Sequence, residues 1–363
     1  MREYKLYIIN PTKVKNDKLE RSEQMTKAKY LVAFALIMIL GANMLFASKT
    51  DVQMKLWNRW TYETSDGEVQ ENQFSLSRGY FRINHYFTDD IKGRFNVDIF
   101  SDDDANDGAG LKLKYAYLDF KNLLPMQGAK LTIGLMKTYF GTIYSWDYPT
   151  IAKDPTDMYK ISSSTDYGLG ISGDMPSNLG EYNLAMYNGE GYKKTGSDVN
   201  KYPAFVGNAR FNLMKNIMLG GSAYLANKTG TTEPYDEKTA FAGIANLQFG
   251  PVDFWGEYLM KNVTVNSKSS DETKSAGFML MPIIELTPYL ELVLRYDQWD
   301  PNTDMDDDAY NLMVGGVNFK ISEASKGVML QLNYENKSFE DDSMDSISKI
   351  VAQLRWAFST PKL

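Results

Sequence analysis

Basic side chains stand at alternate positions in several short segments of the sequence. Lys112 and Lys114, for example, alternate with Leu111, Leu113 and Tyr115. Cations that lie together on one face of a strand attract anions through charge-assisted hydrogen bonds, and this requires no nucleophile. Residues of this kind and spacing point to the binding or selection of small charged solutes rather than to covalent chemistry.

The sequence lacks most of the residues that usually carry out covalent catalysis or bind metal ions. The chain of 363 residues has no Cys and a single His, His85, which excludes thiol catalysis, Cys/His zinc sites and multi-His metal centres. A His-dependent triad would have to use His85, which ends an alternating segment beside a short turn and is poorly placed for that role. We predict no catalytic residues, no metal site and no cofactor, and hence that the chain is not an enzyme.

Three acidic runs, 102–108, 300–308 and 340–345, could suggest calcium binding. An EF-hand loop needs Gly at its sixth position and Glu at its twelfth, and in the first run Asp107 and Leu113 occupy these positions. Two interpretations remain for the runs: divalent cations could bridge them to lipopolysaccharide phosphates, or they could be solvated loop charge. We favour the second.

The elements that carry these residues are strands. From Asp51 onward the apolar residues recur with a period of two, as in 52–56, 131–135, 328–334 and 350–358, which is typical of strands with one apolar face. Short links fall at 65–68, 88–91, 121–128, 174–180, 215–216, 250–251, 285–288 and 321–326. Longer polar links fall at 101–110, 142–164, 188–201, 227–238, 266–273, 299–308 and 338–346, and together they separate about sixteen strands.

Alternating short and long links are typical of transmembrane β-barrels, which have short periplasmic turns and long extracellular loops. A sheet in lipid must close on itself because every backbone polar group needs a partner. Aromatic residues cluster near the predicted strand ends, as at Trp60 and Tyr62 or Tyr296 and Trp299, where an interfacial girdle is expected. We predict an all-β, antiparallel, up-and-down transmembrane barrel. The alternative is a soluble sandwich with these aromatic residues in its core.

In such a barrel, the positions between the apolar residues face the water-filled lumen. The predicted pore-lining residues are Lys55, Arg59, Arg78, Arg82, Arg94, Asp98, Lys112, Lys114 and Lys130 on the early strands and Arg210, Glu257, Glu291, Arg295 and Arg355 on the later ones. The early wall is therefore basic and the later wall mixed. The strand register around Arg78–Phe81 is open, because a bulge there would turn several side chains over.

The longest link, 142–164, is the candidate constriction. Its charged and aromatic residues include Trp146, Asp147, Lys153, Asp154, Asp157, Tyr159 and Lys160. Carboxylates that face a basic wall would create a field across the pore and set its ion preference. The loop carries only two Lys against three Asp, which is too few cations for a dedicated phosphate site. Phosphate selectivity therefore stays an alternative, as does an ordinary surface loop.

The first residues carry a targeting pattern. The apolar run 31–47 follows Lys27 and Lys29 and ends with a small residue, Ala47, as in a secretory signal peptide. We predict a signal peptide at 25–47, a non-structural or untranslated extension at 1–24 and the barrel domain at 48–363. Segment 1–47 holds 8 of the 39 basic and 4 of the 46 acidic residues, so the remainder has a net charge of about −11. An acidic surface speaks against a nucleic-acid partner.

Four stretches, 78–84, 93–99, 113–120 and 131–137, and the last strand, which ends at Phe358, carry a resemblance to known proteins. They resemble Gram-negative outer-membrane porins, most nearly the phosphate-selective porin O/P family and its relatives. The last strand resembles the signal that the barrel assembly machinery reads. The resemblance implies an outer-membrane location, a third extracellular loop folded into the barrel, a homotrimer, and contacts with outer-membrane lipid and lipopolysaccharide.

We therefore expect a porin that lets small hydrophilic solutes and ions diffuse passively through a charged constriction. The alternatives are an anion- or phosphate-preferring channel and a non-conducting structural or adhesive barrel.

Overall fold

A computed structural model describes residues 49–102, 108–126, 128–194, 201–229, 236–265, 272–321 and 327–360. The predicted extension at 1–24, the predicted signal peptide at 25–47 and most of the acidic run 102–108 lie outside the described residues, and those predictions stay predictions. No helix within these ranges is long and apolar enough to cross a membrane.

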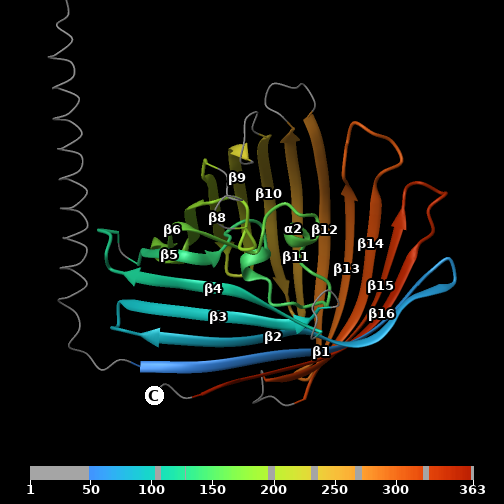
Figure 1. Cartoon of the computed structure of the whole chain (residues 1–363), viewed down its shortest axis with the longest axis horizontal. Coiled ribbons are helices and arrows are strands. Elements are labelled where there is room, and N and C mark those ends of the chain that lie inside the picture. Colours follow the sequence, from blue (N-terminus) through green and yellow to red (C-terminus); the bar gives the residue numbers. More distant parts are fainter. Residues whose placement is uncertain are drawn as a thin grey trace, which may run out of the picture. The chain divides into compact units, whose positions relative to one another are not determined.

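The chain from Lys49 onward forms one closed sheet of sixteen antiparallel strands, which confirms the predicted barrel (Figure 1). The strands are β1 (Lys49–Ser65), β2 (Glu68–Tyr86), β3 (Ile91–Ser101), β4 (Ala109–Lys121), β5 (Lys130–Lys137), β6 (Thr165–Met175), β7 (Gly180–Tyr187), β8 (Ala204–Met214), β9 (Ile217–Thr229), β10 (Asp236–Phe249), β11 (Val252–Thr264), β12 (Glu272–Thr287), β13 (Leu290–Asp300), β14 (Tyr310–Lys320), β15 (Val328–Phe339) and β16 (Ile347–Ser359). Three single turns of helix are described: η1 (Ile143–Ser145), α2 (Pro155–Met158) and η2 (Pro176–Asn178).

Each strand pairs with its neighbours in the sequence, and β1 closes the barrel on β16. Trp57, for example, lies opposite Arg78 of β2 on one side and Arg355 of β16 on the other. Closure leaves no long edge within the membrane, so the backbone N–H and C=O groups find partners without water.

The two faces of the sheet differ in the way that the alternation predicts. On β13, Val293, Arg295 and Asp297 are buried inside the barrel, whereas Leu294 and Tyr296 are exposed on its outer surface. Large apolar side chains are exposed in the same way on nearly every strand, and a continuous exposed apolar surface marks contact with lipid rather than with water.

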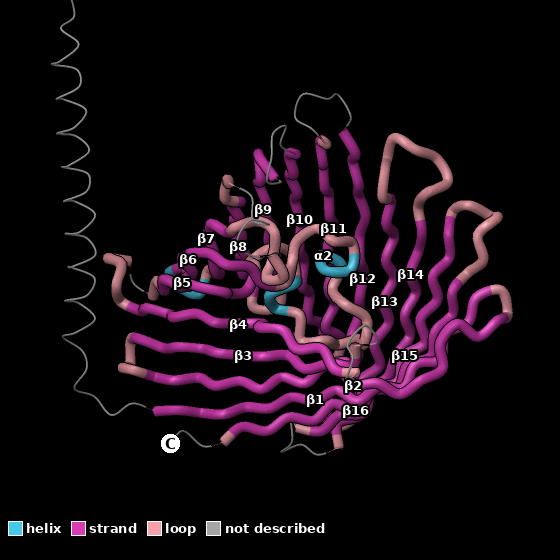
Figure 2. The backbone as a smooth tube through the Cα atoms, viewed as in Figure 1, coloured by secondary structure: helices cyan, strands magenta, loops and turns pink. Residues whose placement is uncertain are grey.

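Most links follow the predicted alternation. The longest, 138–164, follows β5 and turns back into the barrel instead of extending outward (Figure 2). The links 122–129 and 321–327, after β4 and β14, lie where short links are predicted but have eight and seven residues, as many as several of the predicted long loops. The two-residue turn Asp66–Gly67, in contrast, lies at the same end as the long loops. Here the strands themselves are long, so the loop is replaced by an extended β1–β2 hairpin.

A bulge lies at Ser77, where the β1–β2 register shifts between the pairs Trp57–Arg78 and Asn58–Leu76. It precedes the segment 78–81, so Arg78 and Arg82 share the inner face with Tyr80. A second bulge in β4 turns both Lys114 and Tyr115 inward.

We predict that Leu294→Arg destabilises the barrel in lipid vesicles by about 2–4 kcal/mol, because the new charge would lie in the apolar band. Gln298→Arg is the matched control, since Gln298 is exposed on the same face but nearer the strand end. Guanidinium unfolding of both variants, followed by gel migration with and without heating, measures the difference. Equal stabilities would contradict the assignment of this face to lipid.

Candidate functional site

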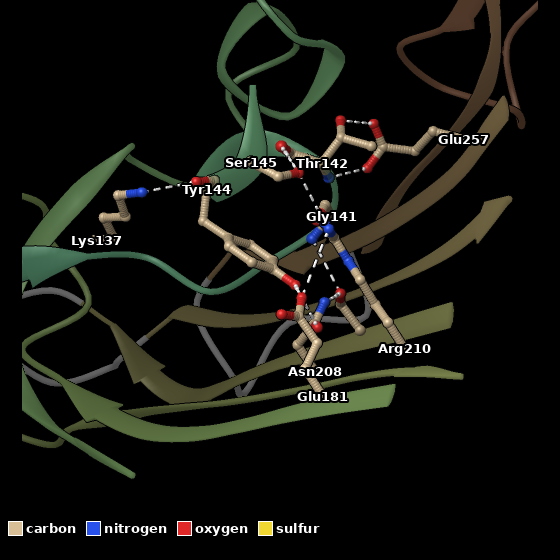
Figure 3. Close-up of polar contacts among 10 residues, drawn as sticks. Lys137, Gly141, Thr142, Tyr144, Ser145, Glu181, Asn208, Arg210 and Glu257 are labelled. Carbon is tan, nitrogen blue, oxygen red and sulfur yellow. Dashed lines mark hydrogen bonds and ion pairs between the residues drawn. The ribbon is translucent and has the colours of Figure 1, made fainter. Parts of the chain in front are cut away.

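The loop 138–164 crosses the barrel and is held at its first turn by residues of β8, β9 and β11 (Figure 3). Thr142 donates to both carboxylate oxygens of Glu257, from its backbone N–H at 2.9 Å and from its hydroxyl at 2.6 Å. Arg210 donates to the carbonyl of Gly141 at 3.0 Å, and the Gly141 N–H donates to Ser222 Oγ at 2.9 Å. Glu257 and Arg210 are buried beneath the loop and fix its start.

Gly141 is required at this turn. Its φ is +55°, a left-handed conformation that L side chains rarely adopt, and an added Cβ would lie 2.2 Å from Glu257 Oε1 and 2.5 Å from Thr156 Oγ1. Glycine is the residue that supplies this conformation without steric cost. The tight contact between the loop and Glu257 depends on it.

The residues of η1 connect the loop to β5, β7 and β8. Lys137 at the end of β5 donates to the carbonyl of Tyr144 at 3.0 Å, and the Tyr144 hydroxyl donates to Glu181 at 2.6 Å (Figure 3). The Arg210 guanidinium lies 4.2 Å from the centroid of the Tyr144 ring, within range of a cation–π contact.

A buried ion pair holds the middle of the loop. Arg295 and Asp297 on β13 have fully buried side chains that contact each other at 2.5 Å, and Arg295 also donates to the carbonyl of Lys153 at 2.6 Å. The Tyr159 hydroxyl donates to Asp297 at 2.6 Å, and its ring stacks on Trp299 with centroids 4.5 Å apart. Trp299 therefore faces inward, and its predicted place in the outer girdle is wrong.

Asp154 caps α2 inside the barrel. Its carboxylate accepts from the backbone N–H of Asp157 at 3.0 Å, and the side chain is almost completely buried. Burial raises the pKa of Asp154 to about 8, and the nearby carboxylates of Asp157 and Glu257 act in the same direction. Asp154 is thus largely protonated at neutral pH.

The tip of the loop lies against β1, β15 and β16. The carbonyl of Tyr148 accepts from Arg355 at 3.0 Å and from Gln331 at 3.1 Å, and its ring meets Trp57 edge-on at 4.5 Å. The neighbouring Asp147 side chain is 87% exposed and lies 4.0 Å from Lys55 and 3.7 Å from Arg355. Its carboxylate therefore projects into the lumen.

A basic wall on β1–β5 faces this tip across a cavity of about 190 Å³. We define the basic wall as Lys55, Arg82, Arg94 and Lys137. Arg82 donates to Asn96 at 2.9 Å and to Gln53 at 3.2 Å, and Arg94 donates to Asn84 at 2.8 Å. Among the described residues, no carboxylate oxygen lies within 4.0 Å of Arg82, Arg94 or Lys137, so neutral groups hold these cations in place.

Other predicted pore-lining cations have carboxylate partners. Asp98 lies 4.0 Å from Arg78 and 3.6 Å from Lys112, and Lys130 lies 3.6 Å from Asp119. Arg78 is also enclosed by the rings of Trp57, Tyr80 and Tyr148. Asp119 can balance the charge of Lys130, whereas the single carboxylate of Asp98 is shared by Arg78 and Lys112 and cancels their charges only in part.

The remaining predicted residues lie on the same inner face. Arg59 donates to Gln353, Lys114 donates to Ser164 at the end of the loop, and Glu291 pairs with Lys320. On the loop itself, Lys153 and Lys160 are exposed, Asp157 is partly so, and Trp146 lies between Arg295 and the cavity. Asp154 and Tyr159 are buried and hold the loop instead of presenting charge to the lumen.

Beyond the loop, a larger cavity of about 820 Å³ lies toward the short turns of β10–β15. Asp253, Glu285 and Glu291 line it together with Lys320 and Arg355. Because Trp146, Asp147 and Tyr148 line both cavities, the loop separates a basic compartment from a mixed one.

Sequence reasoning missed several residues of this site. Lys137, Tyr144 and the amides Gln53, Asn84 and Asn96 act together with the predicted cations. The alternation could have placed the amides on the inner face. Nothing in the sequence indicates which amide would orient which guanidinium. The described part of the chain holds no cluster of three or more His, Cys, Asp or Glu side chains placed for a metal ion.

No protein-family model and no curated protein matches the chain by sequence. Solved structures do match it. The anion-selective porin from Comamonas acidovorans has a TM-score of 0.62 and 15% identity, with coverage of 86% of this chain and 100% of that one. The outer membrane channel DcaP of Acinetobacter baumannii has a TM-score of 0.62 and 10% identity, with coverage of 86% and 97%.

OmpT, an outer membrane protein of Vibrio cholerae solved in a trimer form, has a TM-score of 0.63 and 10% identity, covering 86% of this chain and 100% of its own. At these identities the likeness shows the fold. The chain has the closed sixteen-stranded architecture of Gram-negative outer-membrane barrel porins.

We predict that Tyr159→Phe loosens the loop, because it removes the hydroxyl that donates to Asp297 and leaves the ring stacked on Trp299. The lost hydrogen bond to a charged acceptor should cost about 1.5–3 kcal/mol in loop docking. Trypsin cleavage after the exposed Lys153 and Lys160 measures loop release, and it should become faster in the variant. Tyr62→Phe, in the outer girdle, is the control, and equal cleavage in all three proteins would contradict the anchoring role.

We also predict that the docked loop becomes less stable as the pH rises. The folded pKa of Asp154, about 8, exceeds its unfolded value of about 3.9. Protonation of Asp154 therefore stabilises the docked loop fully below about pH 4, and this stabilisation is lost as the pH rises through about 8.

Asp154→Asn keeps the N-cap and removes the titration. Tryptic cleavage of the wild type should become faster between about pH 6 and 9, after correction for trypsin activity, and the difference from the variant isolates Asp154. Parallel pH profiles for the two proteins would show that Asp154 does not titrate in this range.

Proposed function

We propose that this chain is an outer-membrane porin that lets small hydrophilic solutes and ions diffuse passively, and that it carries out no covalent chemistry. The observation that carries the proposal is the inward-folded loop, which divides a polar, charged lumen without filling it. A barrel that served only as a scaffold would gain nothing from an exposed carboxylate held opposite unpaired cations. The location, the outer membrane of a Gram-negative bacterium, follows from the apolar outer face and the porin fold.

A second candidate, an anion-preferring channel, is favoured by the basic wall. Arg82 and Arg94 are positioned by amides, which accept hydrogen bonds without cancelling charge. A carboxylate partner would both orient a guanidinium and neutralise its field, whereas an amide only orients it. The wall therefore keeps a positive potential at the narrow part of the lumen, which raises the local concentration of anions.

We further propose that the chain belongs to the phosphate-selective porin O/P family. The segments quoted above support it, and the anion-selective porin from Comamonas acidovorans shares the fold. A phosphate preference would appear as block of the chloride current by inorganic phosphate. A homotrimer and insertion by the barrel assembly machinery through β16 belong to the same proposal.

The test is single-channel conductance in a planar bilayer with a KCl gradient. The porin proposal expects discrete conductance steps, and the anion proposal expects a reversal potential toward that of chloride. A protein that inserts and shows heat-modifiable migration but never conducts would be a structural or adhesive barrel instead. A cation-selective reversal would overturn the anion candidate alone.

We predict that Arg82→Gln combined with Arg94→Gln lowers the chloride-to-potassium permeability ratio by about threefold or more, because the unpaired charges supply the local field. Lys274→Gln is the control, since Lys274 is exposed at a strand end beside Glu272 and Asp304. A shift of the same size in the control would mean that overall charge, rather than the basic wall, sets the preference.

A further inference from the structure

The β1–β2 hairpin extends beyond the end of β3, the strand that pairs with the rest of β2. β1 pairs with both β16 and β2 as far as Ser65, whereas the β2–β3 pairing stops at the pair Gly79–Ile99 (Figure 1). Among the described residues, no strand pairs with the outer side of 68–76. We call this side of the segment the β2 edge.

The direction of the free backbone groups follows from one hydrogen bond. The Leu76 N–H donates to Ser101 Oγ at 2.8 Å, so it points away from β1. Because N–H and C=O directions alternate along a strand, the N–H groups of Phe74 and Asn72 point the same way. From Asn72 to Leu76 the β2 edge thus offers an ordered row of main-chain donors and acceptors, a template for another strand. Nearer the turn, a bulge at Gln70 shifts the register.

The β2 edge lies at the rim of the apolar band and beyond it, if the barrel sits in the outer membrane as proposed. Trp60 and Tyr62 mark the rim on β1, and they lie opposite Phe74 and Asn72. Trp60 Nε1 donates to Asn72 Oδ1 at 3.0 Å, as expected for an interfacial tryptophan with a wet polar tip. Residues 68–71 therefore lie in water on the side of the long loops.

The hairpin carries several acidic side chains and one large, highly exposed apolar side chain. Asp66, Glu68 and Glu71 stand in it, and no Lys or Arg occurs between Arg59 and Arg78. Phe74 is 84% exposed, the most exposed of the large apolar side chains among the described residues. It also lines a groove of about 490 Å³ on the outer surface, with Trp60, Leu76 and Leu354.

We propose that the β2 edge is a docking site for an extended, basic peptide segment of another protein, which adds to the barrel wall as a further strand. Main-chain hydrogen bonds to the β2 edge would provide the affinity, and Lys or Arg side chains beside Glu68 and Glu71 the specificity. A second copy of this edge is disfavoured as the occupant, because it would bring like charges together. Carboxylates that served only to protect an exposed edge from pairing would leave the binding of a basic peptide independent of its backbone donors.

The test measures binding of a fluorescein-labelled peptide of alternating Lys and Val to the refolded full-length barrel, by fluorescence anisotropy. The control peptide has the same sequence with every second backbone nitrogen methylated, which removes half of its donors and keeps its charge. The proposal expects the methylated peptide to bind at least tenfold more weakly. It also expects the bound peptide to slow amide hydrogen exchange at 68–76.

Protein variants separate edge pairing from charge attraction. Glu68→Gln with Glu71→Gln should weaken binding by about twofold to thirtyfold, since two exposed ion pairs together contribute about 0.4–2 kcal/mol. Asp342→Asn with Asp345→Asn removes the same charge from another exposed loop and should change nothing.

Equal binding of both peptides, equal effects of both double variants, or peptide-independent dimerisation would overturn the proposal. The conductance assay is run on the same preparation. A barrel that conducts but binds the plain and the methylated peptide equally refutes the docking site alone. A barrel that prefers the plain peptide but does not conduct refutes only the porin function.

Discussion

Closure of the sheet through the β1–β16 pairing is the constraint on which the rest of this structure depends. A sheet surrounded by lipid cannot leave backbone groups unpaired, so β1 must meet β16 along its length, as it does from Gln53 to Ser65. Once the sheet is closed, alternation assigns each side chain to lipid or to the lumen. Polar side chains can then gather inside at a density that no soluble core would tolerate.

That polar interior explains how the loop is held. Arg295, Asp297, Glu257 and Arg210 would be costly to bury alone, since an unpaired buried charge loses its hydration. Each instead meets a partner that the loop supplies or completes, such as the Thr142 hydroxyl for Glu257 or the Lys153 carbonyl for Arg295. Because breaking any one of these contacts leaves a buried charge or donor unsatisfied, the network specifies a single loop position more than it adds stability.

Much of the fold could be predicted from the sequence, because a period of two assigns both strand and face. The same rule shows where the prediction went wrong. Tyr296 and Trp299 are three residues apart and cannot share a face of β13, and Trp299 is the one that stacks inside on Tyr159. The sequence leaves the register around Arg78–Phe81 open, but it locates neither the bulge at Ser77 nor the one in β4, because bulges depend on how two strands match in length. Loop contacts such as Tyr159 with Asp297 join residues 138 positions apart, which no local pattern encodes.

From the sequence alone, all inward-facing cations look equivalent. The structure shows that some of them pair with carboxylates and others with neutral groups. Lys130 and Arg295 each meet a carboxylate of their own, and Arg78 and Lys112 share that of Asp98, so the fields of these cations are wholly or partly cancelled within the wall. Arg82 and Arg94 meet amides, and Lys137 meets a carbonyl. These groups orient a cation and leave its charge uncancelled. A chain with a net charge of −7 can therefore present a positive surface beside the inward-folded loop, since the local potential depends on which charges remain unpaired in the lumen rather than on the sum over the molecule.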